Sequence, residues 1–291
     1  MTAPITAHTK IAGVVGAPIN HSLSPRMHNA WIQAARIDAV YLAFGPREAD
    51  FENLIWGLRG GVVAGLNITI PFKERALALA DRADPLARAA GAANLLLFGA
   101  DGTIEARNTD GEGLLQAFRV LAPHVDLMAG PVTILGAGGA ARGAAAALLA
   151  AGTPQVRVVN RTLERARALA DQLGEKVAPF EAGRIKDAVT DTVAVINATS
   201  LGLGGGAGPT VPWSSLSPEA AAMDMVYKPL TTEFLRQAKA HGLVAVDGLE
   251  MLIRQAIPSF HAMFGVQPPA GVDTRQLLLA ELESVVTEYS R

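Results

Sequence analysis

Gly136, Gly138 and Ala141 have the spacing of the G-x-G-x-x-G/A pattern, in which glycines let a backbone approach a pyrophosphate closely. The pattern binds a dinucleotide when it lies between a strand and a helix, because the first N–H groups of the helix bind the phosphates. Residues 132–135 are apolar enough for a short buried strand, and the Ala- and Leu-rich residues 140–151 favour a helix. We therefore predict a dinucleotide site here. The alternative is a tight strand-to-helix turn without a ligand.

The residues after the next predicted strand bear on the choice of cofactor. An enzyme that uses NAD usually carries Asp or Glu about 20 residues beyond the glycines, where it binds the adenosine ribose. This strand instead ends in Asn160, Arg161 and Thr162, with Arg165 and Arg167 just beyond. A guanidinium stays charged and can bind a phosphate through two hydrogen bonds. The position therefore favours NADP over NAD, and the alternative is a solvated basic helix start.

Lys73 and Asp110 are candidates for acid–base chemistry. Lys73 follows a predicted strand end and Pro71, and an ammonium held there could donate a proton to a carbonyl oxygen. Asp110 follows Asn108 and Thr109 at a predicted helix start. Taken alone, the lysine could equally be a surface residue and the aspartate a helix cap. Turns and caps could likewise account for the other polar loop residues, which are Ser22, Ser24, Asn67, Thr69 and Asn94.

The amino-acid composition of the chain is typical of a globular protein. Half of the 291 residues are hydrophobic, with 29 glycines and 17 prolines, which is not typical of a disordered chain. The length is enough for two domains, each with its own core. The formal net charge is −2 and there is no long basic run, so we do not expect nucleic acid or an anionic membrane as a partner.

Composition also excludes several kinds of chemistry and location. The chain has no cysteine, which rules out disulfides, thiolate nucleophiles and cysteine metal ligands, and we expect no metal site. Residues 1–9 lack the basic start and apolar core of a signal peptide. The longest apolar stretch, 143–152, is too short to span a bilayer. We therefore expect a cytoplasmic enzyme with a small-molecule substrate.

Strands and helices alternate through the first third of the chain, which predicts an α/β unit. Ser24 is the predicted N-cap of its first helix, with Pro25 at the first helical position. No phosphate-binding glycine pattern occurs here, so we expect this unit to bind the substrate. The predicted strands are 11–16, 40–44, 62–68, 95–98 and 103–106, and the predicted helices are 24–36, 51–58, 72–80, 85–90 and 111–121.

The second half predicts a wound parallel sheet that starts at the glycine pattern. Its predicted strands are 132–135, 155–159, 193–197, 222–227 and 243–247, and its predicted helices are 140–151, 163–173 with Thr162 as cap, and 232–241. Two helices, 249–264 and 273–289, follow the last strand and could pack back on the first unit. We thus predict an α/β fold with an N-terminal α/β substrate domain, residues 1–112 with 249–291 returning to it, and a Rossmann-type nucleotide-binding domain, residues 113–248.

Nine short motifs in series resemble those of the shikimate dehydrogenase family. Their order and spacing match from about residue 11 to beyond Gln255. Any one of them could arise by chance, whereas nine in series are specific. The motifs are Ser22-Leu23-Ser24-Pro25, Asn67-Ile68-Thr69-Ile70-Pro71-Phe72-Lys73, Ala93-Asn94, Asn108-Thr109-Asp110-Gly111, Gly136-Ala137-Gly138-Gly139-Ala140, Asn160-Arg161-Thr162, Asn197-Ala198-Thr199-Ser200, Asp224-Met225-Val226-Tyr227 and Asp247-Gly248-Leu249-Glu250-Met251-Leu252.

The resemblance implies an oxidoreductase that reduces 3-dehydroshikimate to shikimate with NADPH, on the route to chorismate and the aromatic amino acids. In the family pattern Lys73 and Asp110 form the catalytic pair, and the C-terminal helix returns to the substrate domain. Residues implied to bind substrate are Ser22, Ser24 and Tyr227 at the carboxylate, and Thr69, Asn94 and Gln255 at the ring hydroxyls. Residues implied to bind NADP are Gly136, Ala137, Gly138, Gly139, Ala140, Asn160, Arg161, Thr162, Arg165, Met225 and Gly248.

Two features depart from the family pattern. Arg107 stands where many members carry an acidic or small residue, and residues 204–206 make one loop unusually rich in glycine. Neither coincides with a matched catalytic position. They leave the geometry of two loops undetermined.

Three alternatives to this function stay open, and a homodimer is an open assembly state. A quinate or dual quinate/shikimate dehydrogenase is disfavoured by Ser24, where dedicated quinate enzymes carry threonine, and by Arg161. A methylene-tetrahydrofolate dehydrogenase would not be expected to show the substrate motifs. A non-catalytic NADP-binding regulator would have no need of Lys73 together with Asp110.

Overall fold

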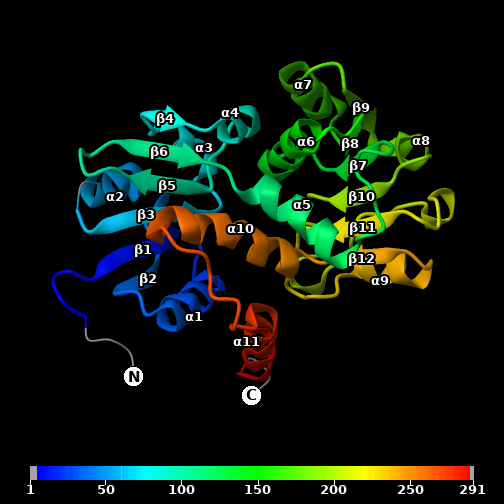
Figure 1. The fold of residues 1–291 in the computed structure, drawn as a ribbon. Coiled ribbons are helices and arrows are strands. Elements are labelled where there is room, and N and C mark those ends of the chain that lie inside the picture. The colour runs from blue at the N-terminus through cyan, green and yellow to red at the C-terminus, as the bar shows by residue number, and fades with distance from the viewer. Residues whose placement is uncertain (1–4, 60, 289–291) are drawn as a thin grey trace. The chain divides into compact units, whose positions relative to one another are not determined.

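The computed structural model describes residues 5–59 and 61–288, and the chain divides into two compact units (Figure 1). Unit 1 consists of Met1–Thr109 and Gln255–Arg291, and unit 2 consists of Asp110–Arg254. The chain therefore leaves the first unit once and returns to it once. Both units are α/β, as predicted.

A mixed six-stranded sheet forms the centre of unit 1, in the order β2-β1-β3-β5-β6-β4. β1 is parallel to β2 and β3 because helices connect these strands in the chain, whereas β5 is antiparallel to both of its neighbours. The strands are β1 (Lys10–Val15), β2 (Ala39–Phe44), β3 (Val63–Ile68), β4 (Arg82–Ala83), β5 (Leu95–Phe98) and β6 (Ile104–Arg107). The helices before unit 2 are α1 (Ser24–Ala35), α2 (Phe51–Leu58), α3 (Lys73–Ala78) and α4 (Pro85–Ala90), with a 3-10 turn at Glu48–Asp50.

A pair of aromatic rings holds the start of α3 in place. Phe51 at the start of α2 and Phe72 just before α3 are fully buried, with ring centroids 4.4 Å apart and planes 4° from parallel. Arg75 on α3 forms an ion pair with Glu52 on α2, and its guanidinium carbon lies 5.2 Å from the centre of the Phe51 ring. These contacts hold the start of α3 against the start of α2. They therefore position Lys73, the first residue of α3.

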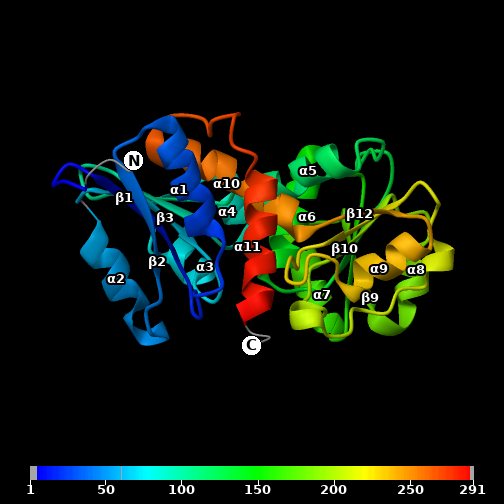
Figure 2. The ribbon, with the colours of Figure 1, turned by 90° about the horizontal axis from the view of Figure 1, so that it is seen from below.

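The two terminal helices are α10 (Gly248–Phe264) and α11 (Thr274–Glu288). α10 begins in unit 2, and its residues from Gln255 onward belong to unit 1. Phe260 on α10 lies with its ring centroid 5.4 Å from that of Trp31 on α1. The indole N–H of Trp31 donates to the hydroxyl of Thr274 at 2.8 Å, and Figure 2 shows α1 and α11 side by side. The prediction that the last helices pack on the first unit is confirmed.

Unit 2 contains a wholly parallel six-stranded sheet in the order β12-β11-β10-β7-β8-β9, which can be followed in Figure 1. The chain starts in the middle at β7, winds to one edge through β8 and β9, and then to the other edge through β10, β11 and β12. This is the doubly wound arrangement that binds ligands at the carboxyl ends of the strands, where the winding reverses. The strands are β7 (Val132–Leu135), β8 (Val156–Asn160), β9 (Val177–Glu181), β10 (Ala194–Asn197), β11 (Ala221–Asp224) and β12 (Val244–Val246).

Two apolar clusters cover the two faces of this sheet. Ile134 and Ile196 face one cluster, whereas the following or preceding residues, Leu135 and Val195, face the other. Successive side chains of a strand point to opposite faces, so the strands read as continuous apolar runs. The helices are α5 (Asp110–Leu121), α6 (Gly139–Ala151), α7 (Leu163–Leu173), α8 (Ile185–Val189) and α9 (Glu233–Ala240), with 3-10 turns at Ala182–Arg184, Leu203–Gly205 and Trp213–Ser215.

Two strands of unit 2 differ from the sequence prediction. β9 was not expected, since its Pro179 lacks an N–H, but β9 is an edge strand and has one side without a partner strand. The strand expected over 222–227 ends at Asp224 instead. The Asp224 carboxylate accepts the main-chain N–H of Val226 at 3.0 Å, which turns the chain out of the sheet.

One predicted helix cap is wrong, and a second is correct in its position only. α1 begins at Ser24 itself with Leu23 at the N-cap position, and the Ser24 main-chain N–H donates to the hydroxyl of Ser22 at 3.3 Å. Thr162 does occupy the N-cap position of α7, but its side chain accepts no capping hydrogen bond. The predicted end of the last helix, Tyr289, lies outside the described residues.

Candidate functional site

The glycine pattern forms the predicted turn between β7 and α6. Gly136 has φ 108°, and a Cβ built on it would lie 3.2 Å from the carbonyl oxygen of Ala198. Only glycine fits there without strain. Gly138 is the N-cap of α6, and Cβ atoms on Gly138 or Gly139 would meet nothing within 4 Å. The turn therefore presents the start of an α-helix to open space, which is the arrangement that binds phosphate oxygens.

The candidate ribose-phosphate residues lie directly beside this turn. The main-chain N–H of Gly136 donates to the carbonyl oxygen of Val159 at 2.8 Å, so β7 and β8 end next to one another. Asn160 ends β8, and its side-chain amide donates to the carbonyl oxygen of Thr162 at 2.8 Å. This bond closes the turn that carries Arg161.

Arg161 and Arg165 are exposed, and neither forms an ion pair within the described part of the chain. Their guanidinium groups are thus available to an anion at the end of β8. A phosphate would satisfy both the charge and the donors of such groups. Together with the turn at Gly136, they make a cationic edge beside a helix start.

The ends of β10 and β11 are joined by a buried carboxylate. Asp224 accepts hydrogen bonds from the amide of Asn197 at 3.0 Å and from the hydroxyl of Thr232 at 2.6 Å. Burial raises the pKa of Asp224, while these hydrogen bonds act in the opposite direction. Asn197 also donates to the carbonyl oxygen of Leu201 and accepts the hydroxyl of Thr199. The network fixes the loops that follow two neighbouring strands.

Met225 and Gly248 lie against one another in unit 2. A Cβ built on Gly248 would lie 2.6 Å from the carbonyl oxygen of Met225, so only glycine allows this approach of α10 to the β11 loop. Tyr227, farther along the same loop, is half-buried, and burial raises the pKa of its phenol. Its hydroxyl is therefore a neutral donor across the physiological range.

In unit 1, β1 and β3 end together and start the loops that carry the predicted substrate residues. Thr69 follows β3, and its N–H donates to the carbonyl oxygen of Val15 on β1 at 2.9 Å. Ser24 is 7% exposed and Ser22 is half-buried in the loop after β1. The carbonyl oxygen of Lys73 accepts the N–H of Ala93 at 2.9 Å, which ties the start of α3 to the segment before β5.

Asn94, Thr109 and Gln255 meet in a buried polar cluster of unit 1. The Asn94 amide donates to the hydroxyl of Thr109 at 2.9 Å and to Oε1 of Gln255 at 3.2 Å. Asn94 Oδ1 in turn accepts the main-chain N–H of Thr109 at 2.8 Å. Asn94 is 2% exposed and Thr109 is 7% exposed. Two residues expected to bind ring hydroxyls, Asn94 and Gln255, are thus brought together across 161 positions of sequence.

The same cluster contains residues that sequence reasoning did not place in a site. Asn67 donates to the hydroxyl of Ser259, and Tyr41 donates to Asn67. Thr109 stands within the Asn-Thr-Asp motif, and Ser259 lies one helical turn after Gln255, so both had a sequence signal. Tyr41 had none, because its position in β2 predicts only a core residue.

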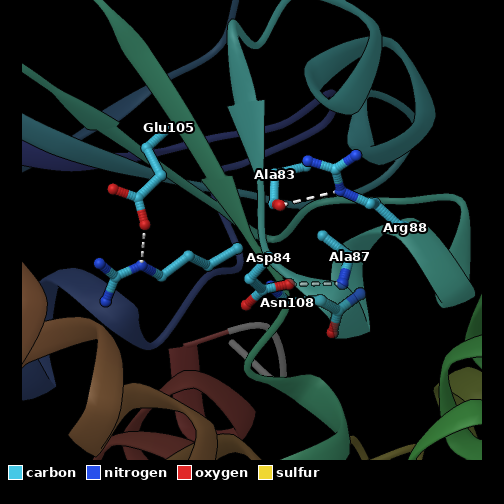
Figure 3. Close-up of polar contacts among 7 residues, drawn as sticks. Ala83, Asp84, Ala87, Arg88, Glu105 and Asn108 are labelled. Atoms are coloured by element: carbon cyan, nitrogen blue, oxygen red, sulfur yellow. Dashed lines mark hydrogen bonds and ion pairs between the residues drawn. The ribbon is translucent and has the colours of Figure 1, made fainter.

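A second set of polar contacts holds the chain just before Thr109 (Figure 3). Asp84 caps α4 by accepting the N–H of Ala87, and its other oxygen accepts the main-chain N–H of Asn108 at 3.3 Å. Arg107, the residue that departs from the family pattern, donates to Glu105 at 2.6 Å on the same strand. The charge of Arg107 is therefore balanced by Glu105, and the arginine does not disturb the segment after β6.

Asp110 is half-buried as the first residue of α5 and thus of unit 2, whereas Lys73 belongs to unit 1. Among the side chains that the structure describes, in residues 5–59 and 61–283, no group of three His, Cys, Asp or Glu is arranged to hold a metal ion. Within the same ranges, no helix has the length and apolar character needed to cross a membrane.

Two family models match the chain. The model described as shikimate dehydrogenase substrate binding domain matches residues 14–96, and the model described as shikimate / quinate 5-dehydrogenase matches residues 121–202. A protein of Caulobacter vibrioides named shikimate dehydrogenase (NADP(+)) is 56% identical over 285 residues, which cover 98% of this chain and 100% of that protein. One of the same name from Cereibacter sphaeroides is 42% identical over 278 residues, covering 95% of this chain and 100% of the relative.

Solved structures of a shikimate dehydrogenase and of a quinate dehydrogenase are similar to this chain. Shikimate 5-dehydrogenase of Thermus thermophilus in complex with NADP(H) and shikimate has a TM-score of 0.79 and 37% identity, covering 89% of this chain and 95% of that one. Quinate dehydrogenase of Corynebacterium glutamicum in complex with NAD has a TM-score of 0.85 and 30% identity, covering 94% of this chain and 99% of that one.

Proposed function

The chain belongs to the shikimate dehydrogenase family, and from this premise we propose that it catalyses the reversible reduction of 3-dehydroshikimate to shikimate with NADPH. It is an oxidoreductase of the biosynthetic route to chorismate and the aromatic amino acids. The observation that carries the assignment is 56% identity, over 98% of the chain, to a relative named shikimate dehydrogenase (NADP(+)). Unit 1 is proposed as the substrate domain and unit 2 as the NADP domain.

The carboxyl edge of the sheet in unit 2 fits NADP. The open start of α6 can accept a pyrophosphate, and the exposed guanidinium of Arg161 can bind the additional phosphate that distinguishes NADP from NAD. When bound, the cofactor donates or accepts a hydride. We propose that the residues that hold it are Gly136, Ala137, Gly138, Gly139, Ala140, Asn160, Arg161, Thr162, Arg165, Met225 and Gly248.

The substrate residues are assigned from the family pattern and supported by their chemistry. Ser22 and Ser24 are hydroxyl donors in the loop after β1 and would bind the carboxylate, and Tyr227 is assigned to the same group. Hydroxyls suit a small ligand that must leave again, since they bind a carboxylate more weakly than arginine. Asn94 and Gln255, with Thr69, would bind the ring hydroxyls. A site of paired polar groups rejects analogues that lack a hydroxyl, because a group in the protein is then left unpaired.

Lys73 and Asp110 are proposed as the catalytic pair. Reduction of a ketone produces an alkoxide, which requires a proton or a nearby cation. The Lys73 ammonium can provide both, and the Asp110 carboxylate can orient it. General acid–base catalysis of this kind contributes about 10²–10⁴ in rate.

The direct test is a spectrophotometric assay at 340 nm with shikimate or quinate, each with NADP or NAD. Shikimate with NADP should give the highest kcat/KM. Faster turnover of quinate would instead assign the chain to the quinate-active members of the family. Cofactor binding without turnover of either acid would identify it as a non-catalytic NADP-binding protein.

A homodimer and a cytoplasmic location are further proposals. β2 is one of the two edge strands of the sheet in unit 1. Leu42 on β2 is 41% exposed and Val62 nearby is 50% exposed, which supports association through this edge. Light scattering on the purified protein tests the assembly.

The use of NADPH supports a cytoplasmic location, and cell fractionation tests that location.

A further inference from the structure

Ser259 is fully buried on α10, one helical turn after Gln255, and its hydroxyl joins three segments of unit 1. Its Oγ lies 3.0 Å from Nδ2 of Asn67, 3.2 Å from Oγ1 of Thr109 and 3.2 Å from the main-chain oxygen of Gln255. We propose that Ser259 is a positioning residue that orients the side-chain amides of Asn94 and Gln255. This inference rests on the proposed function, which assigns ring hydroxyls to those two amides.

The orientation of the Asn67 side-chain amide determines which hydrogen bond the Ser259 hydroxyl can donate. Nδ2 of Asn67 lies 3.2 Å from the main-chain oxygen of Asn94, which can only accept, so the NH2 group must be on that side. The other side, Oδ1, then accepts the phenol proton of Tyr41 at 2.8 Å. The same NH2 group donates to Ser259, whose own proton is therefore directed to Thr109 or to the main chain of Gln255.

The chain of donors ends on the two amides. Oδ1 of Asn94 faces the main-chain N–H of Thr109, so its NH2 group faces the Thr109 hydroxyl and Oε1 of Gln255. Since Oε1 of Gln255 faces Asn94, the NH2 group of Gln255 is directed away from Asn94. The rotation of both amides thus depends on the position of the Thr109 hydroxyl, which Ser259 contacts.

Water cannot easily replace any member of this chain. Tyr41, Asn67, Asn94 and Thr109 are 1%, 7%, 2% and 7% exposed, and Ser259 is 0% exposed. A buried polar group that loses its partner must rotate to find another or remain unsatisfied. Removal of the Ser259 hydroxyl should therefore change the orientation of the side-chain amides of Asn94 and Gln255.

The test compares Ser259→Ala with Ser259→Thr, which retains the hydroxyl. Ser259→Ala should raise KM for shikimate about 10-fold, the effect of one lost hydrogen bond, with kcat within about threefold and KM for NADP unchanged. It should also narrow the preference for shikimate over an analogue that lacks one ring hydroxyl. Ser259→Thr should restore most of both properties. Thr133→Val is the matched control, because it removes a fully buried hydroxyl from unit 2 and should lower Tm without changing KM for shikimate.

Tyr41→Phe is a second route if Ser259→Ala fails to fold. This substitution removes the first donor in the series of hydrogen bonds that leads through Asn67 to Ser259, and it retains the aromatic ring. It should raise KM for shikimate severalfold. Unchanged KM and unchanged discrimination in folded Ser259→Ala or Tyr41→Phe, with active wild type, would overturn the positioning role. Wild-type protein that does not oxidise shikimate would overturn the proposed function and this inference with it.

Discussion

His28 is stacked on Tyr41, with ring centroids 4.1 Å apart and ring planes 7° from parallel. Trp31 and Phe260 lie around the same imidazole, at centroid distances of 5.3 and 5.9 Å. None of these three aromatic rings carries a charge that would stabilise an imidazolium. Burial therefore lowers the pKa of His28 to about 3.

We expect this histidine to make the protein less stable in acid. Above pH 6.5 the imidazole is neutral in both the folded and the unfolded chain. Below that pH the unfolded chain binds a proton that the folded chain does not, so the free energy of unfolding falls until the pH reaches about 3. At pH 5 the loss from this group should be about 2 kcal/mol, measured by urea unfolding at pH 7.5 and pH 5.

His28→Phe should reduce the acid sensitivity, because the variant has no imidazole to protonate and keeps an aromatic ring on Tyr41. His241→Gln is the matched control, since His241 is exposed. Equal losses of stability in the wild type and in His28→Phe would show that carboxylates alone cause the acid sensitivity.

Ser22→Ala and Ser24→Ala should each raise KM for shikimate. A hydroxyl that donates to a carboxylate contributes about 1.5–3 kcal/mol, which corresponds to about a 10- to 100-fold change. KM for NADP should be unchanged. Steady-state kinetics with each substrate varied in turn provide the measurement. Normal KM values in both variants would show that the two serines do not bind the substrate and only form the turn before α1.

Arg161→Ala should weaken NADP binding by one to two orders of magnitude and barely affect NAD, because about 1.5–3 kcal/mol of charged hydrogen bonding to the additional phosphate is lost. Titration calorimetry with the two cofactors measures the difference. Arg167→Ala, an exposed change on α7, the helix that follows Arg161, is the matched control. Equal weakening of NADP and NAD by Arg161→Ala would give the residue a structural role.

Lys73→Ala should lower kcat by about 10²–10⁴ with a much smaller change of KM, because the proton is needed mainly in the transition state. Asp110→Asn should also be slow, since an amide does not carry the charge that orients the ammonium. The double variant should be little worse than the slower single variant, as expected for groups that act as a unit. Steady-state kinetics, with circular dichroism to confirm folding, provide the test. Near-normal kcat in folded Lys73→Ala would remove the lysine from the mechanism.

The sequence predicted those parts of the fold that depend on local pattern. The turn at Gly136 and the helix after it could be predicted because backbone freedom and helix propensity act within a few residues. The strand at 222–227 was predicted too long because Val226 and Tyr227 favour strands, whereas a long-range network at Asp224 turns the chain.

The buried cluster of unit 1 shows where sequence reasoning stops. The hydrogen bond between Asn67 and Ser259 joins residues 192 positions apart. The bond between Tyr41 and Asn67 joins β2 and β3, which are separated by β1 in the sheet. No local pattern contains such a contact. Gln255 and Asn94 could be assigned only through resemblance to a family, since their spacing of 161 positions has no meaning without the fold.

The path of the chain sets the order in which its two units can be completed during synthesis. Unit 2 is one uninterrupted segment, Asp110–Arg254, whereas unit 1 is made of two segments. Trp31 meets Thr274, its hydrogen-bond partner, only after 243 further residues have been added. At typical rates of translation that is a delay on the order of 10–50 s, in which the later unit can fold first. The segment of unit 1 that precedes unit 2 thus leaves the ribosome earlier than unit 2 but belongs to the unit that is finished last.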